Sequence, residues 1–345
     1  MKIAVVILNW NGRKMLEKFL PSVVSHSMPT AEVIIADNGS TDDSIDFLKT
    51  AYPQLRIIAL DKNYGFAEGY NLALKQIEAD YYVLLNDDVE VTPNWIAPVI
   101  EQMEHDDTIA VAQPKLLMYD QRDTFEYAGG AGGFIDKYGY PFCRGRLFTT
   151  LEKDHGQYDD PCEIFWATGA AMFVKAKVWH QIGGLDGDFF AHMEEIDFCW
   201  RTKNSGYRIV YCPRSTVYHV GGGTLPKSSP RKTFLNFRNN MALLYKNLPG
   251  YRRGWVIGLR IVLDYIAALK FLAEGHPKEF SAVAKAHQAF YKWKPQLKAK
   301  RRLSAEPHAI GNIYQGLLLV HYYLLKKQTF DKLPSAFSPQ PNGKQ

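Results

Sequence analysis

The first hundred residues alternate short apolar runs with segments of helical spacing, and few folds accommodate this order. Four runs are short enough to be buried strands: residues 3–8, 33–36, 56–60 and 81–85. Three segments between them repeat apolar residues every three or four positions: 13–26, 41–51 and 66–77. This alternation predicts an α/β fold with a doubly wound, mostly parallel central sheet.

Polar residues follow each predicted strand. Ligands of doubly wound sheets bind in the crevice beyond the carboxyl ends of the strands, so chemistry is expected there. The residues in these places are Asn9 and Asn11, Asp37 and Asn38, Asn63, and Asn86, Asp87 and Asp88. The sequence therefore predicts a polar site along one edge of the sheet.

Carboxylates at a strand end have no packing role, which makes Asp87 and Asp88 candidates for a site. A hard divalent cation prefers oxygen ligands, and a bound diphosphate needs its charge balanced. A carboxylate, Mg²⁺ or Mn²⁺ and a diphosphate together meet both requirements. A turn is the simpler interpretation of these residues taken alone, as is a helix cap for Asp37 to Asp42.

The pattern changes twice further along the chain. Residues 118–162 are irregular and rich in glycine, which is typical of a functional loop region. An ordered stretch over 165–213 follows and contains an acidic cluster. No strand is expected beyond residue 225, where helices are predicted over 252–273 and 313–327.

Charge is distributed very unevenly. Residues 1–225 carry 20 Lys and Arg against 31 Asp and Glu, whereas residues 226–345 carry 21 against 5. We therefore expect an acidic catalytic region, 1–225, and a basic, mainly helical region, 226–345. The basic region can meet an anionic membrane surface or an acidic partner, or can be a solvated face. Nucleic acid is not expected as a partner.

The chain shows no sign of export. Its four cysteines are scattered without a C-x-x-C pair, and the first apolar run is too short for a signal peptide or a membrane span. The expected location is the cytoplasm, with peripheral attachment to the inner face of the plasma membrane as the alternative.

Several motifs in a fixed order resemble glycosyltransferase family 2, in particular its rhamnosyltransferase-like subgroup. The first four are Asn9-Trp10-Asn11-Gly12, Asp37 to Asp42, Asn63-Tyr64-Gly65-Phe66 and Asn86-Asp87-Asp88. The resemblance continues through residues 166–172, 183–186, 194–201 and 218–223. It implies a GT-A fold and the transfer of one sugar, with inversion, from a nucleoside diphosphate sugar to an acceptor hydroxyl. A dTDP- or UDP-linked donor and a glycan or lipid-linked acceptor of cell-surface polysaccharide synthesis would then be the substrates.

The resemblance also implies roles for single residues. Asp37 would bind the donor base, and Asn86 would face its ribose. The donor side as a whole would comprise Asn9, Asn11, Asp37, Asn38, Asn63, Gly65, Phe66, Asn71, Asn86, Asp87 and Arg238. Trp166, Thr168 and Gly169 would lie on the acceptor side. Asp88 and His219 would bind Mg²⁺ or Mn²⁺, although a lone histidine is more often structural.

The acidic cluster is the expected source of the catalytic base. Inversion by direct displacement requires the acceptor hydroxyl to lose its proton, which a carboxylate can take. Glu195 is the preferred candidate, and Glu194 and Asp197 stay open because the family usually has Glu-Asp where this chain has Glu194-Glu195. Acidic residues also favour a helix N-terminus, which is the structural alternative.

Other functions fit the motifs less well. A dinucleotide-dependent dehydrogenase needs G-x-G-x-x-G where this chain has Asn9-Trp10-Asn11-Gly12. A sugar nucleotidyltransferase would show a glycine-rich basic loop near the first strand, and a non-catalytic adaptor would not need the whole set of candidate residues. Since the Q-x-x-R-W signature of processive synthases is absent, single additions are expected.

Overall fold

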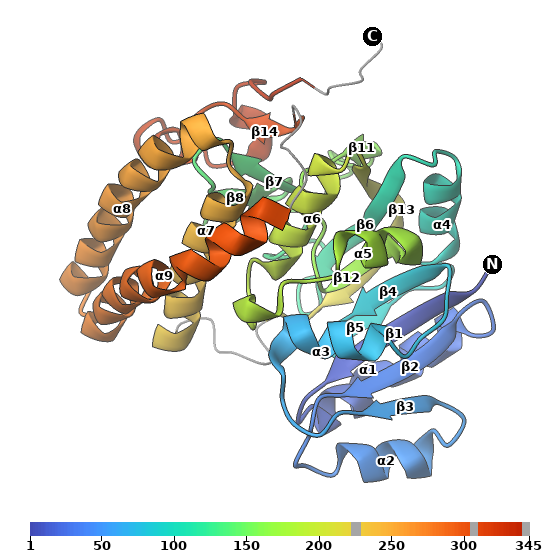
Figure 1. Cartoon of the computed structure of the whole chain (residues 1–345). Helices are drawn as coiled ribbons and strands as arrows, with labels where there is room; N and C mark the ends of the chain where they lie inside the picture. Colours follow the sequence, from blue (N-terminus) through green and yellow to red (C-terminus); the bar gives the residue numbers. More distant parts are fainter. Residues whose placement is uncertain (222–228, 304–309, 340–345) are drawn as a thin grey trace.

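The computed structural model describes residues 1–221, 229–303 and 310–339, and a central sheet of nine strands organises them (Figure 1). The strands are β1 (Ile3–Asn9), β2 (Glu32–Asp37), β3 (Arg56–Ala59), β4 (Tyr81–Leu85), β5 (Val89–Val91), β6 (Ile109–Met118), β11 (Cys162–Glu163), β12 (Ala171–Lys175) and β13 (Arg208–His219). Across the sheet the order is β11, β13, β6, β12, β4, β1, β2 and β3, with β5 paired to β13.

Most of this sheet is parallel. β1 runs parallel to β2 and β4, with Asn9 beside Asp37 and Ile7 beside Leu85. β12 runs antiparallel to its neighbours β4 and β6, and β13 runs parallel to β6. The mostly parallel, doubly wound sheet predicted from the sequence is confirmed. Residues that follow β1, β2 and β4 therefore meet at one edge.

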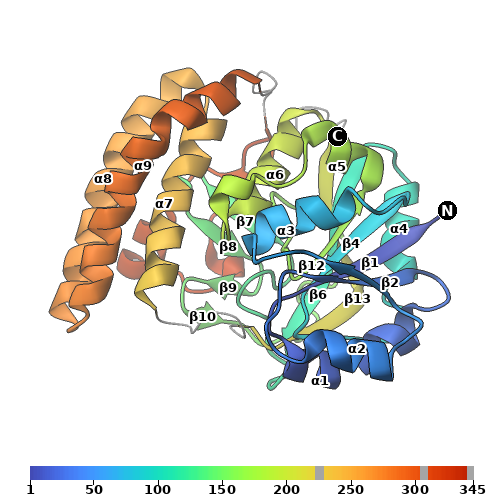
Figure 2. The same ribbon diagram turned by 60° about the horizontal axis from the view of Figure 1, so that its bottom comes forward.

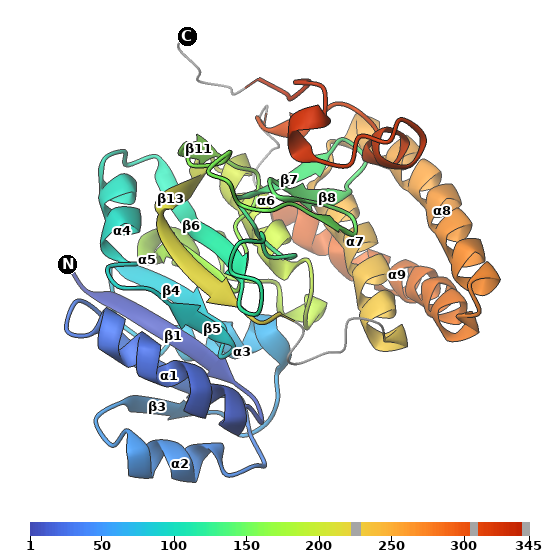
Figure 3. The ribbon, with the colours of Figure 1, turned by 180° about the vertical axis from the view of Figure 1, so that it is seen from behind.

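Helices cover both faces of the central sheet. They are α1 (Arg13–Ser27), α2 (Ser44–Ala51), α3 (Gly65–Leu74), α4 (Ala97–Glu104), α5 (Ala176–Ile182) and α6 (Glu194–Asn204). α1, α2 and α4 pack with Val5 and Ile7, whereas α3, α5 and α6 pack with Ala4 and Val6. Figure 1 shows α3 and α5 in front of the sheet, and Figure 3, from behind, brings α1 forward. Because β1 is covered on both sides, it is an almost unbroken apolar run.

A second, five-stranded sheet lies beside the first. Its strands, in order, are β10 (Thr150–Leu151), β9 (Arg146–Leu147), β8 (Pro141–Cys143), β7 (Gly133–Asp136) and β14 (Ile313–Tyr314). The irregular stretch predicted over 118–162 is thus partly ordered, and the expectation of no strand beyond residue 225 is wrong. Strands of two to four residues are too short to show a periodic pattern.

Three long helices form a layer next to α6 and the small sheet (Figures 1 and 2). They are α7 (Pro230–Asn247), α8 (Gly250–Ala273) and α9 (Pro277–Leu303), and α8 confirms the helix predicted over 252–273. The helix predicted over 313–327 is wrong, because Tyr314 packs with Phe142 and Phe337 as part of the small sheet. Among the helices of the described residues, none combines the length and apolar character needed to cross a bilayer.

Candidate active site

Hydrogen bonds tie together the loops that follow β1 and β2. Asn9 is fully buried and donates through Nδ2 to Asp37 at 2.8 Å and to Ser40 Oγ at 3.0 Å. Asp37 also accepts the backbone N–H of Ser40 at 2.9 Å. Asn11 Oδ1 accepts the backbone N–H of Thr41 at 2.7 Å. The predicted donor-side residues Asn9, Asn11 and Asp37 therefore lie together.

Asn38 holds the turn that precedes α3. Its amide nitrogen donates to the Gly65 carbonyl at 3.0 Å and to Asn63 Oδ1 at 3.2 Å, and its oxygen accepts the N–H of Tyr64 at 3.0 Å. Gly65 has a φ of +76°, a conformation that favours glycine, and a Cβ there would lie 2.7 Å from the Phe190 carbonyl oxygen. Asn38, Asn63 and Gly65, all predicted on the donor side, therefore lie together, and Gly65 contacts Phe190 in the segment that precedes α6.

His219, the last residue of β13, lies between two carboxylates. Its Nε2 is 3.0 Å from Asp88 Oδ1, its Nδ1 is 3.3 Å from Glu126 Oε1, and all three side chains are buried. Burial alone would lower the pKa of His219, but Asp88 and Glu126 raise it to about 10. Burial alone would raise the pKa of Asp88, but the charge of His219 holds it below its ordinary value. The two predicted metal ligands are thus neighbours.

The pair of Asp88 and His219 fits a divalent cation whose other ligands come from a diphosphate. Atoms 3.0 Å apart can both ligate one cation at about 2.1 Å each. Metal-binding histidines commonly place their second ring nitrogen against a carboxylate, as Glu126 does here. The described residues contain no group of three or more His, Cys, Asp or Glu able to hold a metal, so phosphate oxygens would have to complete the ligand set.

Asn86 and Asp87 connect this pair with the turn after β1. Asn86 Nδ2 is 3.4 Å from His219 Nε2. A Cβ at Gly12 would lie 2.2 Å from Asp87 Oδ2, so the glycine leaves room for this carboxylate. Burial, followed by the charge of Asp88, raises the pKa of Asp87 to about 7.

One short segment before β12 connects the turn after β4 with α6. The N–H of Asn86 donates to the Ala170 carbonyl at 3.0 Å. Three residues earlier, the N–H of Ala167 is 3.4 Å from the Sγ of Cys199, in the second turn of α6. The carboxylates after β4 and the acidic start of α6 are therefore attached to the same few residues.

The residues predicted on the acceptor side build this segment. Trp166 is buried and donates its Nε1–H to the Phe134 carbonyl at 2.8 Å. Thr168 is buried too, and its hydroxyl accepts a backbone N–H two residues later at 3.2 Å. Gly169 lies against the ring of Phe66, which a Cβ would approach to 2.9 Å. The polar atoms of Trp166 and Thr168 thus bind the protein itself, and their place on the acceptor side stays a prediction.

The segment before α6 has a strained backbone. Phe190, His192 and Met193 have φ angles of +66°, +71° and +73°, which residues with side chains rarely adopt. Asn239 of α7 is fully buried, and its Nδ2 lies 2.7 to 3.0 Å from three carbonyl oxygens of this segment. Strain of this kind persists only where surrounding groups hold it, and it is concentrated at functional sites.

Glu194 and Glu195 begin α6, and the buried Oε2 of each carboxylate has no hydrogen-bond partner among the described residues. Burial raises the pKa of both side chains, to about 7 for Glu195. Glu195 keeps some contact with solvent, whereas Glu194 is 4% exposed. Because Glu195 is partly exposed and its pKa is raised, its carboxylate can take a proton near neutral pH.

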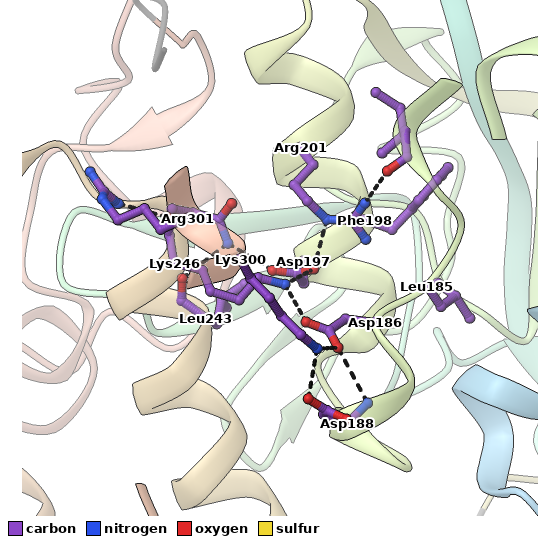
Figure 4. Close-up of polar contacts among 12 residues, drawn as sticks. Leu185, Asp186, Asp188, Asp197, Phe198, Arg201, Leu243, Lys246, Lys300 and Arg301 are labelled. Carbon is purple, nitrogen blue, oxygen red and sulfur yellow. Dashed lines mark hydrogen bonds and ion pairs between the residues drawn. The ribbon is translucent and has the colours of Figure 1, made fainter. Parts of the chain in front are cut away.

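Asp197, the third predicted catalytic carboxylate, belongs to a buried ionic cluster (Figure 4). It accepts hydrogen bonds from Arg201 Nε at 2.8 Å, Lys246 Nζ at 2.8 Å and Asn247 Nδ2 at 2.9 Å. Burial would raise the pKa of Asp197, but Lys246 and Arg201 hold it far below its ordinary value. Asp197 thus connects α6 to α7 and accepts hydrogen bonds on both oxygens, which favours Glu195 over Asp197 as the predicted base.

Two predicted donor-side residues hold loops of the protein. Asn71 donates to the Leu185 carbonyl at 2.8 Å and accepts the Leu185 N–H at 3.0 Å. Arg238 Nη2 donates to the carbonyl oxygens of Phe189 at 3.0 Å and Asp188 at 3.2 Å. Both side chains position the chain before α6, and their contact with the donor stays a prediction.

The sequence analysis missed Glu126 and His192. Glu126 lies in the stretch predicted to be irregular, and no motif marks it. His192 lies two residues before Glu194, its buried Nε2 has no hydrogen-bond partner in the part of the chain that the structure describes, and burial together with Lys232 lowers its pKa to about 4. Residues 222 and 223 of the glycine motif after His219, and most of the Lys/Ser/Pro-rich stretch that follows, lie outside the described residues.

Comparisons with known proteins agree with this geometry. Residues 4–165 match the family Glycosyl transferase family 2. The chain is 24% identical to the N-acetylglucosaminyl-diphospho-decaprenol L-rhamnosyltransferase of Mycobacterium tuberculosis over 63% of this chain and 75% of the relative.

Two solved structures share the fold. The structure of GalNAc-T7 with UDP, GalNAc and Mn²⁺ has a TM-score of 0.55 at 16% identity, and the match spans 86% of this chain but only 56% of that one. The structure of Staphylococcus aureus TarS 1-349 in complex with UDP-GlcNAc has a TM-score of 0.54 at 15% identity, over 88% of both chains. With the motif order and the sheet topology, these matches show that the chain has the GT-A fold and that residues 4–165 carry the sequence pattern of glycosyltransferase family 2.

Proposed function

We propose that the chain transfers one sugar, with inversion, from a nucleoside diphosphate sugar to a hydroxyl of a cell-surface or lipid-linked glycan. One observation carries this proposal: the turn that holds Asp88 and the helix that begins with Glu195 are attached, through Asn86 and Cys199, to opposite ends of one short segment. The name of the mycobacterial relative supports a lipid-linked acceptor and a rhamnosyl-type donor. UDP in the two similar structures supports a UDP- or dTDP-linked donor.

The donor nucleotide would lie along the loops after β1, β2 and β3. Asp37 would accept a hydrogen bond from the base, with Asn9 and Asn11 holding its loop in place. Asn86 would face the ribose. Asp88 and His219 would hold Mg²⁺ or Mn²⁺ beside the diphosphate. When bound, such a cation offsets the negative charge of the departing nucleoside diphosphate. The Mn²⁺ of the GalNAc-T7 structure supports this assignment.

Glu195 would act as the base. As the acceptor oxygen attacks the anomeric carbon, its proton passes to the carboxylate of Glu195, and the bond to the donor diphosphate breaks with its electron pair leaving on the nucleotide. The attack comes from the side opposite the leaving group, so the configuration inverts. Burial suits Glu195 to this task, because it raises the pKa towards neutrality and leaves one oxygen free.

A panel of sugar nucleotides tests the proposal. With Mn²⁺ and no acceptor, we expect slow release of nucleoside diphosphate from one donor, and we expect EDTA or Asp88→Ala to abolish it while circular dichroism stays unchanged. Release of pyrophosphate would instead identify a nucleotidyltransferase. No thermal shift with any nucleotide would identify a non-catalytic adaptor. Full activity of Asp88→Ala would contradict the assigned metal site.

A further inference from the structure

The outermost helix, α8, exposes apolar side chains and buries charged ones. Seven large apolar residues on it are 40 to 82% exposed: Tyr251, Trp255, Val262, Tyr265, Ile266, Leu269 and Leu272. At 100° per residue they occupy one side of the helix, together with the exposed Gly254 and Gly258. The helix has 24 residues and is therefore about 36 Å long. A surface helix in water has the opposite arrangement.

The protein-facing side of α8 carries a buried charged group. Arg260 and Asp264 are 3% and 1% exposed and pair with each other at 3.2 Å, and Asp264 also lies 3.1 Å from His287 of α9. Arg260 donates to the Tyr138 carbonyl at 2.9 Å and covers the ring of Tyr140. These contacts fix the rotation of α8, so the apolar side cannot turn inward without breaking them.

The C-terminal segment extends the apolar face of α8. Tyr323, Leu324 and Leu325 are 43%, 74% and 55% exposed. The charges of Lys270 and Glu274, at the end of α8, act on Tyr323, which shows that the two elements are close. Exposed apolar side chains therefore also lie near the end of the helix.

Cationic side chains lie beside this face. A cavity of about 850 Å³ between α8 and α9 is lined by Ile257, Ile261 and Phe290 and by Arg253, Lys294 and Lys298. These three cations form no salt bridge with a carboxylate among the described residues. An apolar wall next to cations matches the chemistry of an anionic lipid, whose chain is apolar and whose headgroup is negative.

We propose that the outer face of α8, with residues 323–325, lies in the interface of an anionic lipid bilayer. The apolar side chains enter the acyl boundary, and Arg253, Lys294 and Lys298 receive lipid headgroups. A second copy of the chain fits this face less well. Residues 226–345 hold 21 basic against 5 acidic residues, and a two-fold interface would set these like charges against each other.

Vesicle co-sedimentation of the full chain tests this proposal. Wild type should bind vesicles of phosphatidylcholine with phosphatidylglycerol, and binding should weaken as salt rises or as phosphatidylglycerol is removed. The triple variant Val262→Ser, Ile266→Ser, Leu269→Ser should lose more than about tenfold in binding, because three aliphatic side chains no longer leave water. Met28→Ser is the matched control, since Met28 is 41% exposed in another part of the surface.

A second measurement places the helix directly. Vesicles with brominated acyl chains should quench part of the tryptophan fluorescence, and Trp255→Phe should remove that part. Equal vesicle binding by wild type and the triple variant would overturn the proposal, as would binding indifferent to salt and to phosphatidylglycerol. A lipid-free dimer that sedimentation velocity detects in wild type and not in the triple variant would also overturn it, because α8 would then be an interface between two copies.

Discussion

Three carboxylates at the start of α6 differ in protonation because their partners differ. Asp197 faces Lys246 and Arg201, which keep it ionised. Glu194 and Glu195 face no cation, and burial makes their charged forms costly. Carboxylates whose pKa values separate in this way commonly divide structural and catalytic tasks. The spacing in the sequence identifies all three acids, but it does not show that the pKa of Asp197 is lowered while those of Glu194 and Glu195 are raised.

The pH dependence of transfer should follow Glu195. A base works only when deprotonated, so kcat/KM should fall as the pH falls through about 7, the raised pKa of this side chain. Glu195→Gln should lower kcat by about 10² to 10⁴ and Glu195→Asp by less. Initial rates across the pH range with the identified donor measure both effects. A flat profile between about pH 5 and 9 would exclude Glu195 as the base.

Thermal unfolding supplies the control for these variants. The folded state raises the pKa of Glu195, so its contribution to stability is present below the unfolded pKa and is lost as the pH rises through about 7. Glu195→Gln never ionises, and above that pH its Tm should equal or exceed that of wild type. A lower Tm would mean that the loss of activity reflects unfolding.

Glu126 should control metal affinity without touching the substrate. It lies beside Nδ1 of His219 and so fixes which ring nitrogen faces Asp88. Glu126→Gln keeps the shape and removes the charge, and the Kd for Mn²⁺ should rise about 10- to 100-fold. Electron paramagnetic resonance measures free Mn²⁺ directly. An unchanged Kd would show that Glu126 serves only the fold.

At the scale of elements, the entry to α6 depends on α7. The strained residues 190–193 could relax if no other group held them. Two neighbouring side chains of α7 hold them in place: Arg238 donates to the carbonyl oxygens of residues 188 and 189, and Asn239 donates to those of residues 189 and 192. The helix that carries Glu195 is thus oriented by a region of the chain that contributes no reacting group.

Asn239→Ala should therefore lower kcat while the protein stays folded. The variant removes a side-chain donor from the carbonyl oxygens of residues 189, 191 and 192 and lets residues 189–193 move, which hydrogen exchange should detect as faster exchange there. Asn240→Ala is a matched control, because Asn240 is also buried but binds the Gly139 carbonyl at 2.8 Å, away from this segment. Equal loss of kcat in both variants would show a general effect of α7.

At the scale of the whole molecule, the sequence predicts the first sheet well and the second sheet poorly. Strands such as residues 3–8 are long, apolar and followed by polar loops, so pattern and structure agree. Strands of two residues, such as β9 and β14, exist because tertiary contacts select them. The predicted site residues also differ in whether a sequence pattern or a tertiary contact determines their role. Asp88 and His219 stand in motifs, whereas the role of Asn71 or Trp166 depends on which distant carbonyl each side chain meets.

The acidic and basic regions of the sequence share one core in the structure. Lys246 of α7 is buried with Asp186 at 2.6 Å and Asp197 at 2.8 Å, and Lys300 of α9 reaches Asp188 at 2.7 Å (Figure 4). The main apolar cluster likewise includes residues of α3, α6, α7 and α9 together with β14. Residue 225 thus marks a change in charge composition within one core. We expect the regions before and after it to fold cooperatively.

Urea unfolding should accordingly show one transition for the whole chain, with circular dichroism and tryptophan fluorescence changing together. The fragment 1–225 should not fold, because Asp186 would lose Lys246 and Lys300, Asp197 would lose Lys246, and removing one partner of a buried ion pair costs about 3–5 kcal/mol. Lys246→Met in the full chain removes the same cation and should lower the midpoint strongly. Lys300→Met should lower it less, because Lys300 is 35% exposed and water can replace part of its contact. Two separate transitions, or a fragment 1–225 with native near-ultraviolet circular dichroism, would show that the regions are independent domains joined only by sequence.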